Sequence, residues 1–138
     1  MSTIHDLPTP ALLLDIDVLE GNLKRMSGRC KELGVRLRPH VKTHKCLEVA
    51  LAQRALGAQG ITVSTLPEAR AFAEGGFDDI TWAFPVIPGR LHEAAELADR
   101  VRFGVVVDSM TAVDGLIGTG APFRVWIKID CGYGRVGV

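Results

Sequence analysis

Short segments in which apolar and polar residues alternate are separated along this chain by longer segments with apolar residues every three or four positions. Strict alternation predicts strands, whereas the longer period predicts amphipathic helices. The expected strands are 11–14, 35–42, 60–64, 79–84, 101–107 and 123–130. The expected helices run from Asp17 to Gly34 and over 46–56, 65–75, 89–99 and 109–117. From residue 35 onward, five strands alternate with four helices, which predicts a parallel sheet with right-handed crossovers.

Two of the helices are expected to begin with a capping box, in which a side chain at the start and an acidic side chain three residues later satisfy each other's backbone N–H groups. The pairs are Asp17 with Glu20 and Thr65 with Glu68. A buried stripe is expected on the first helix at Leu19, Leu23, Met26 and Cys30.

The strands are apolar on one face only. The apolar positions are Ile61, Val63, Ile80, Trp82, Phe103, Val105, Val107, Val125, Ile127 and Ile129, and the positions between them are mostly polar or small. A doubly wound sheet has helices on both faces and needs apolar residues on both. The pattern therefore predicts an α/β barrel with a polar lumen. A complete TIM (β/α)8 barrel takes about 250 residues, so residues 1–138 are expected to be the N-terminal part of a barrel domain, with about five βα units.

Composition excludes several classes of protein. The 16 basic and 16 acidic residues cancel, which removes the electrostatic argument for a nucleic-acid or anionic-membrane partner. No apolar run is long enough to cross a bilayer. Three widely spaced cysteines and a start without signal-peptide character favour a cytoplasmic location.

The expected strand 35–42 carries the strongest candidate chemistry. Val35, Leu37, Pro39 and Val41 share its apolar face, and Arg36, Arg38, His40 and Lys42 share the other. A lysine at the carboxyl end of such a strand, beside like charges and partly shielded from water, should be nucleophilic, as imine chemistry requires. A solvated basic strand is the alternative. In a barrel, Asp79 and Asp130 are the expected counter-charges for Arg36 and Arg38.

Two further motifs lead to weaker hypotheses. The sequence 130–137 contains Gly-x-Gly-x-x-Gly after a strand, but no helix and acidic residue follow it here to complete a dinucleotide fingerprint. A tight loop that presents Arg135 to the same cavity as Lys42 is expected instead, the alternative being a turn with a solvated arginine. His40 and His44 flank Lys42, but apart from Cys46 no further ligand lies at a dependable spacing, so no metal ligand is assigned.

These motifs resemble the fold type III pyridoxal-phosphate enzymes with an alanine-racemase-type barrel, and within them the branch of D-threonine aldolases and D-serine dehydratases. The similarity extends over the whole chain. Its stretches are LPTPAL (7–12), RLRPHVKTHK (36–45), GITVSTL (60–66) with Glu68-Ala69, GFDDI (76–80) and DCGYGRVGV (130–138).

The resemblance implies roles for three residues. Lys42 would form the Schiff base with pyridoxal 5'-phosphate and move the substrate α-proton, Arg135 would contact the cofactor's phenolic oxygen, and His40 would be a further cofactor contact. It also implies that residues 1–15 pack on a carboxyl-terminal β domain. That domain, which is absent from this sequence, would hold a divalent zinc or manganese ion, and the full-length protein would be a homodimer.

The implied function is a lyase acting on small D-3-hydroxy amino acids, of the D-threonine aldolase or D-serine ammonia-lyase type. The sequence does not separate these two reactions. An amino-acid racemase of the same fold and a non-catalytic pyridoxal-phosphate-binding protein are the alternatives. The 138 residues alone are expected to be an inactive fragment.

Overall fold

The computed structural model describes residues 3–138. Its centre is a four-stranded sheet in which all neighbours are parallel and the strand order equals the order in the chain. The strands are β1 (Ile61–Val63), β2 (Asp79–Pro85), β3 (Arg102–Val107) and β4 (Arg124–Ile127). A helix connects each consecutive pair, and these helices are α3 (Leu66–Glu74), α4 (Leu91–Ala98), which follows the 3-10 turn η3 (Pro88–Arg90), and α5 (Met110–Thr119).

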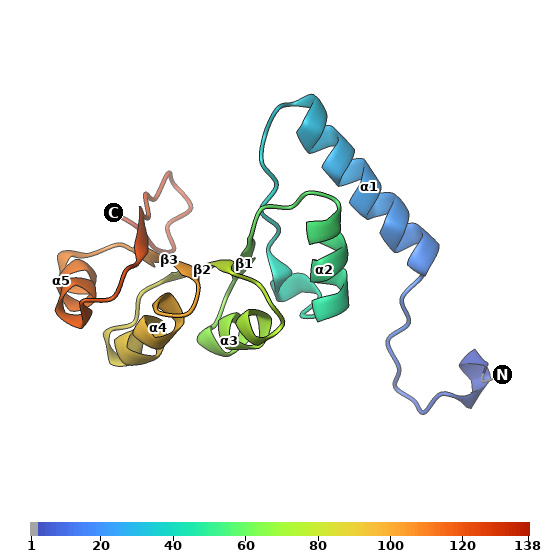
Figure 1. The fold of residues 1–138 in the computed structure, drawn as a ribbon, viewed down its shortest axis with the longest axis horizontal. Helices are drawn as coiled ribbons and strands as arrows, with labels where there is room; N and C mark the ends of the chain where they lie inside the picture. The colour runs from blue at the N-terminus through green and yellow to red at the C-terminus, as the bar shows by residue number, and fades with distance from the viewer. Residues whose placement is uncertain (1–2) are drawn as a thin grey trace.

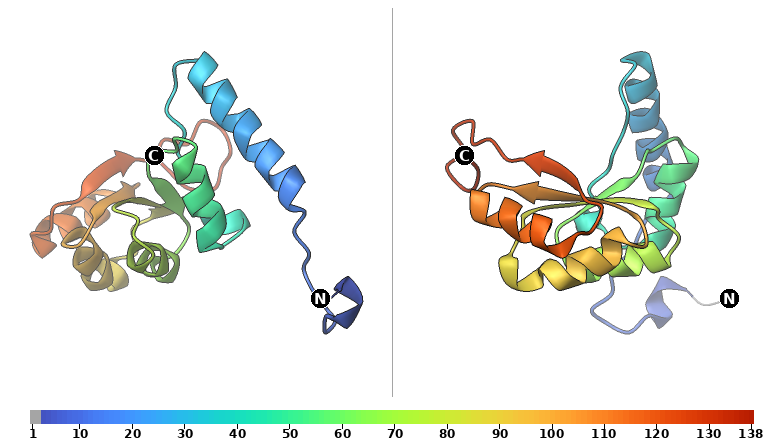
Figure 2. Two further views of the ribbon diagram at one scale, coloured as in Figure 1. Left: turned by 45° about the vertical axis from the view of Figure 1, so that its right-hand side comes forward. Right: turned by 60° about the vertical axis from the view of Figure 1, so that its left-hand side comes forward.

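The helices α3, α4 and α5 lie on the same face of the sheet (Figures 1 and 2). A doubly wound sheet reverses its strand order and carries helices on both faces, whereas a barrel winds in one direction. The sequential order and the one-sided helices therefore confirm the prediction of an α/β, barrel-type fold.

The core lies between the sheet and these helices, as the alternation predicted. The strand residues Ile61, Val63, Ile80, Phe103 and Val105 are each no more than 1% exposed. They pack with residues of the helices, including Leu66, Phe72, Leu97 and Leu116. On β4, which pairs only with β3, Val125 and Ile127 remain exposed. The opposite face is close-packed around Gly104, where an added Cβ would lie 2.9 Å from the Thr81 hydroxyl and 3.3 Å from Trp126 Nε1.

The predicted strand 35–42 is only partly a strand. Its backbone runs beside β1, since Gln59 N–H donates to Leu37 O and Thr62 N–H donates to Pro39 O, both at 2.8 Å. His40 and Thr62 form an isolated parallel bridge. Pro39 has no N–H to donate, which interrupts a regular ladder. The segment then closes into the 3-10 turn η2 (Val41–Thr43), so the sheet has four strands and an irregular edge rather than five strands.

The first helix, α1 (Ile16–Glu32), projects away from the sheet in Figures 1 and 2 and approaches α2 (Leu47–Ala55). The Ser27 hydroxyl joins the two by donating to Leu56 O at 2.5 Å. The expected start at Asp17 was two residues late, because Asp15 is the N-cap and accepts from Val18 N–H. In the expected stripe, Met26 is exposed, whereas the other three positions are half-buried.

Residues 11–14 form no strand in this structure, and their packing on a carboxyl-terminal β domain stays a prediction. Within the described part of the chain these residues pair with no strand, and Leu12, Leu13 and Leu14 are exposed. A strand needs a neighbour for its N–H and C=O groups, which local alternation does not supply. None of the helices formed by residues 3–138 has the length and apolar character needed to cross a membrane.

Candidate active site

Lys42 lies in the turn η2, directly after the extended segment that borders β1. The backbone N–H groups of His44 and Lys45 both donate to Val41 O, at 3.3 and 2.8 Å, and so close this turn. Val41 is fully buried, whereas the side chain of Lys42 is exposed. Because the segment runs parallel to β1, Lys42 emerges at the carboxyl edge of the sheet, where barrel enzymes build their active sites.

His40 lies beside Lys42 and caps the turn. Its Nδ1 accepts a long hydrogen bond of 3.4 Å from Lys42 N–H, and its Nε2 lies 3.5 Å from the Ser64 hydroxyl. Burial and the positive charge of Lys42 lower the pKa of His40, against a smaller opposing effect of Glu68. The imidazole is therefore neutral at pH 7, and an accepting Nδ1 places its proton on Nε2, toward Ser64.

Glu68 connects the turn to the loop after β1. Its carboxylate accepts from Ser64 N–H at 2.8 Å and from Thr65 N–H at 3.3 Å, while Thr65 Oγ1 accepts from Glu68 N–H. The predicted capping box of α3 is thus confirmed. The same carboxylate pairs with Lys45 Nζ at 3.1 Å. The sequence does not indicate this ion pair, because the capping pattern shows what Glu68 does for its own helix and not what else it contacts.

His44 makes none of the hydrogen bonds that His40 makes. Its Nδ1 accepts from Cys46 N–H at 3.1 Å, and its buried Nε2 has no hydrogen-bond partner among the described residues. Over residues 3–138, no group of three or more His, Cys, Asp or Glu side chains is arranged to hold a metal ion.

Arg135 lies in the loop that follows β4. The loop is closed by two backbone hydrogen bonds, from Asp130 N–H to Val138 O at 3.0 Å and from Val138 N–H to Lys128 O at 2.9 Å. The N–H groups of Gly134 and Gly132 donate to Asp130 and lower the pKa of its carboxyl group. Asp130 therefore stabilises its own loop, and its prediction as a counter-charge for the arginines was wrong.

The Arg135 guanidinium lies 5.9 Å from the centre of the Tyr133 ring and lines a pocket of about 340 Å³ with Lys128, Asp130 and Tyr133. The loop follows the carboxyl end of β4, so Arg135 and Lys42 share one edge of the sheet. Strands β1 to β4 separate them, which at about 4.8 Å per strand gives roughly 19 Å along the sheet. The two residues make no contact in the described part of the chain, and their meeting in one cavity stays a prediction.

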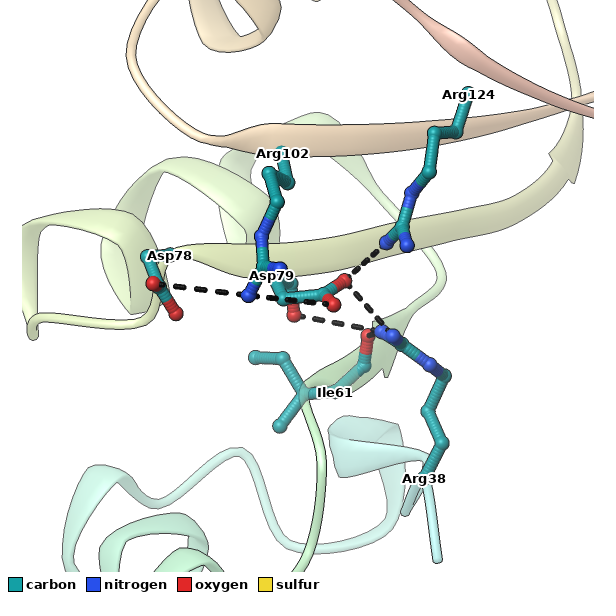
Figure 3. Close-up of polar contacts among 6 residues, drawn as sticks. All are labelled: Arg38, Ile61, Asp78, Asp79, Arg102 and Arg124. Atoms are coloured by element: carbon teal, nitrogen blue, oxygen red, sulfur yellow. Dashed lines mark hydrogen bonds and ion pairs between the residues drawn. The ribbon is translucent and has the colours of Figure 1, made fainter. Parts of the chain in front are cut away.

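A second charged cluster surrounds Asp79, at the opposite edge of the sheet (Figure 3). Arg38 Nη2 lies 2.8 Å from Asp79 Oδ1, and Arg38 Nη1 donates to Ile61 O at 3.1 Å. Arg124 pairs with the same carboxylate oxygen, and Arg102 lies 3.7 Å from the other. The prediction of Asp79 as a counter-charge for Arg38 is confirmed.

The Asp79 cluster lines a pocket of about 560 Å³ to which Arg36 also contributes. Asp79, Arg102 and Arg124 are the first residues of their strands. They therefore lie at the amino edge, away from Lys42, where polar clusters in barrels serve stability. The candidate catalytic residues lie at the carboxyl edge. Lys42, His40 and the Lys45–Glu68 pair lie at the turn η2 beside β1, and Arg135 lies in the loop after β4.

The chain is similar to enzymes that act on D-3-hydroxy amino acids. D-threo-3-hydroxyaspartate dehydratase from Delftia sp. (strain HT23) is 45% identical over 141 residues, covering 99% of this chain and 37% of the relative. D-threonine aldolase from Arthrobacter sp is 38% identical over 135 residues, covering 94% of this chain and 36% of the relative. The crystal structure of D-threonine aldolase from Filomicrobium marinum matches with a TM-score of 0.93 at 38% identity. The match covers 98% of this chain and 38% of that protein.

The chain thus spans little more than a third of the length of these relatives. The family model described as "Alanine racemase, N-terminal domain" matches residues 14–138, which is nearly the whole chain. The parallel sheet in sequential order agrees with this match. The chain belongs to the alanine racemase N-terminal domain family.

Proposed function

We propose that this chain forms part of a pyridoxal-phosphate-dependent lyase acting on D-3-hydroxy amino acids, with Lys42 as the residue that binds the cofactor. The observation that carries the proposal is the exposed amine of Lys42 at the carboxyl edge, next to a neutral imidazole. The neighbouring Lys45 is engaged by Glu68. The similarity to a dehydratase and to an aldolase of D-hydroxy amino acids supports the same reaction class.

The side chains near the turn η2 offer the kinds of chemical group that the cofactor requires. Lys42 supplies a primary amine for its aldehyde, and the orphaned Nε2 of His44 is a polar atom close to the same turn in sequence. Pyridoxal phosphate, when bound, acts as an electron sink for a carbanion. Lys42 Nζ would hold the cofactor and take the substrate α-proton, His40 would present its neutral ring, and Arg135 would donate to the phenolic oxygen.

The two lyase reactions differ in the bond that breaks. Dehydration removes the β-hydroxyl group, whereas aldol cleavage breaks the bond between the α and β carbons, and both begin at the same lysine. A divalent metal that polarises the β-hydroxyl is part of the proposal, but no residue in the described range is assigned to it. A homodimer in the cytoplasm is proposed for the whole protein.

The test of cofactor binding is reductive trapping. The intact protein is incubated with pyridoxal phosphate, reduced with borohydride, digested and analysed by mass spectrometry. The adduct is expected on Lys42, and Lys42→Ala should abolish both the adduct and the cofactor absorbance. Lys45→Ala, the matched control three residues away, should keep them. An adduct on Lys45 in the wild type, or on no lysine, contradicts the assignment.

The test of the reaction compares substrates. The intact protein is assayed with D-threonine, D-threo-3-hydroxyaspartate, D-serine and D-alanine. Each assay is run with and without a chelator, and zinc or manganese is then added back to the chelated samples. Release of ammonia indicates dehydration, release of glycine indicates aldol cleavage, and L-alanine indicates racemisation. Because acid–base catalysis alone contributes about 10²–10⁴-fold, Lys42→Ala should lower kcat/KM by at least that factor. Racemisation without any lyase product would favour the racemase alternative.

A further inference from the structure

Two lysines, Lys42 and Lys45, lie three residues apart at the same edge of the sheet, yet their surroundings differ. The Lys42 side chain is exposed and makes no ion pair with any described residue. The Lys45 side chain is also exposed, at 66%, but its Nζ lies 3.1 Å from Glu68 Oε1, so the two lysines differ in their pairing and not in their exposure. An aldehyde cofactor reacts with whichever amine is available, so the contacts of Lys45 bear on the choice of lysine.

Glu68 provides a fixed negative charge. Its side chain is only 9% exposed, and its Oε2 accepts from two backbone N–H groups, those of Ser64 and Thr65. Burial opposes ionisation, but the hydrogen bonds from Ser64, Lys45 and Thr65 outweigh it and lower the pKa of Glu68. The carboxylate is therefore ionised and held in one orientation at neutral pH.

The backbone at Lys45 is held as well. Lys45 has φ of 49°, the only positive φ of a non-glycine residue in the part of the chain that the structure describes. This left-handed conformation is uncommon for a residue with a long side chain and persists only where the surroundings determine it. Here the Lys45 N–H donates to Val41 O, and its side chain ends at Glu68. The turn that carries Lys42 is thus closed by the backbone of Lys45 and tied to Glu68 by the Lys45 side chain.

We propose that Glu68 is a positioning residue that determines which lysine is available to an aldehyde cofactor. It holds the exposed Lys45 ammonium in an ion pair and leaves Lys42 as the amine without an ion-pair partner among the described residues. To react, the lysine nitrogen must be unprotonated, attack the aldehyde carbon and release one water molecule as the C=N bond forms. Lys45 would first have to leave Glu68 and then lose its proton. This inference rests on the proposed function, since it presumes a cofactor that carries an aldehyde.

The test substitutes Glu68→Gln in the intact protein. Glutamine keeps an oxygen acceptor for the N–H groups of Ser64 and Thr65, so the start of α3 is retained while the charge is lost. Two ratios are measured by mass spectrometry. The first is the Lys45 to Lys42 ratio of borohydride-reduced pyridoxal-phosphate adduct at limiting cofactor. The second is the same ratio after brief acetylation without cofactor. Both should rise about threefold to fivefold, as for loss of one partly exposed ion pair.

Glu20→Gln is the matched control. It removes the partner of Lys24, which lies 2.9 Å from Glu20 on the exposed surface of α1. This change frees a lysine of the same kind far along the chain, so it should leave both Lys45 to Lys42 ratios unchanged. Glu68→Asp, which keeps the charge, should restore part of the wild-type ratio.

The two measurements separate failure of this inference from failure of the proposed function. An unchanged acetylation ratio in Glu68→Gln overturns the inference, whichever lysine binds the cofactor. A raised acetylation ratio with no wild-type adduct on either lysine supports the role of Glu68 and refutes the proposed function alone. A wild-type adduct on Lys45 overturns both.

Discussion

Replacing Asp79 with asparagine isolates the charge at the centre of the arginine cluster. Asparagine has nearly the same shape and keeps one oxygen acceptor, so the packing should not change. The Asp79 carboxylate is 12% exposed and Arg38 is 27% exposed, so this pair is largely shielded from water. Arg124 and Arg102 are 44% and 66% exposed, and water can solvate their charges when the carboxylate is lost.

The magnitude follows from these exposures. A hydrogen bond to a charged group contributes about 1.5–3 kcal/mol, and the half-buried Arg38 would lose most of this. The two more exposed arginines each add about 0–1 kcal/mol. Allowing for the hydrogen bond that asparagine retains, Asp79→Asn should lower the free energy of unfolding by about 2–3 kcal/mol.

Urea denaturation of the intact protein, followed by tryptophan fluorescence and circular dichroism, measures this change. The midpoint should fall with an unchanged slope, because the surface exposed on unfolding is the same. Asp78→Asn is the control, since Asp78 is 85% exposed and lies 3.8 Å from Arg102; its effect should be below about 0.5 kcal/mol. At about 1 M salt, where the screening length is about 3 Å, most of the Asp79 effect should persist. Equal effects of the two substitutions would refute the reasoning.

Two further predictions concern the start of α3. Thr65→Ala removes the side chain that accepts from Glu68 N–H and should cost about 1 kcal/mol of stability; thermal unfolding measures it, and Thr111→Ala, at an exposed helix position, should have a smaller effect. The lowered pKa of Glu68 also predicts a pH dependence. A carboxyl with a lower pKa in the folded state contributes stability that is complete above its unfolded value, near 4.5, and is lost as the pH falls through the folded pKa. The stability difference between wild type and Glu68→Gln should therefore shrink in acid, and a constant difference from pH 6 to pH 3 would contradict this.

Local sequence patterns predict most of the secondary structure from residue 46 onward. The predicted strand 79–84 corresponds to β2 (Asp79–Pro85), and the predicted helix 46–56 to α2 (Leu47–Ala55). The capping box of Thr65 and Glu68 also formed as predicted. These predictions are confirmed because periodicity and capping depend on residues within a few positions of one another. The one-sided polarity of the strands predicted the barrel-type winding for the same reason, since each strand shows locally which face meets the helices.

Which segments pair as strands depends on contacts between distant parts of the chain. Residues 11–14 alternate as a strand would, yet no described segment pairs with them. Segment 35–42 has a neighbour in β1, but Pro39 interrupts the ladder and the chain turns at Val41. Pairing depends on hydrogen-bond donors and acceptors from distant parts of the chain, which the local pattern does not contain.

The partners of the charged groups likewise depend on how the chain folds. Asp79 pairs with Arg38 and Arg124, which are 41 and 45 residues away in the sequence, because parallel packing brings the amino ends of these segments to one edge of the sheet. Asp130, also an aspartate, instead accepts from backbone N–H groups of its own loop. The sequence singled out Lys42 from its neighbours, but only the fold placed Glu68 against Lys45, because an ion pair depends on distances of a few ångströms between separate elements.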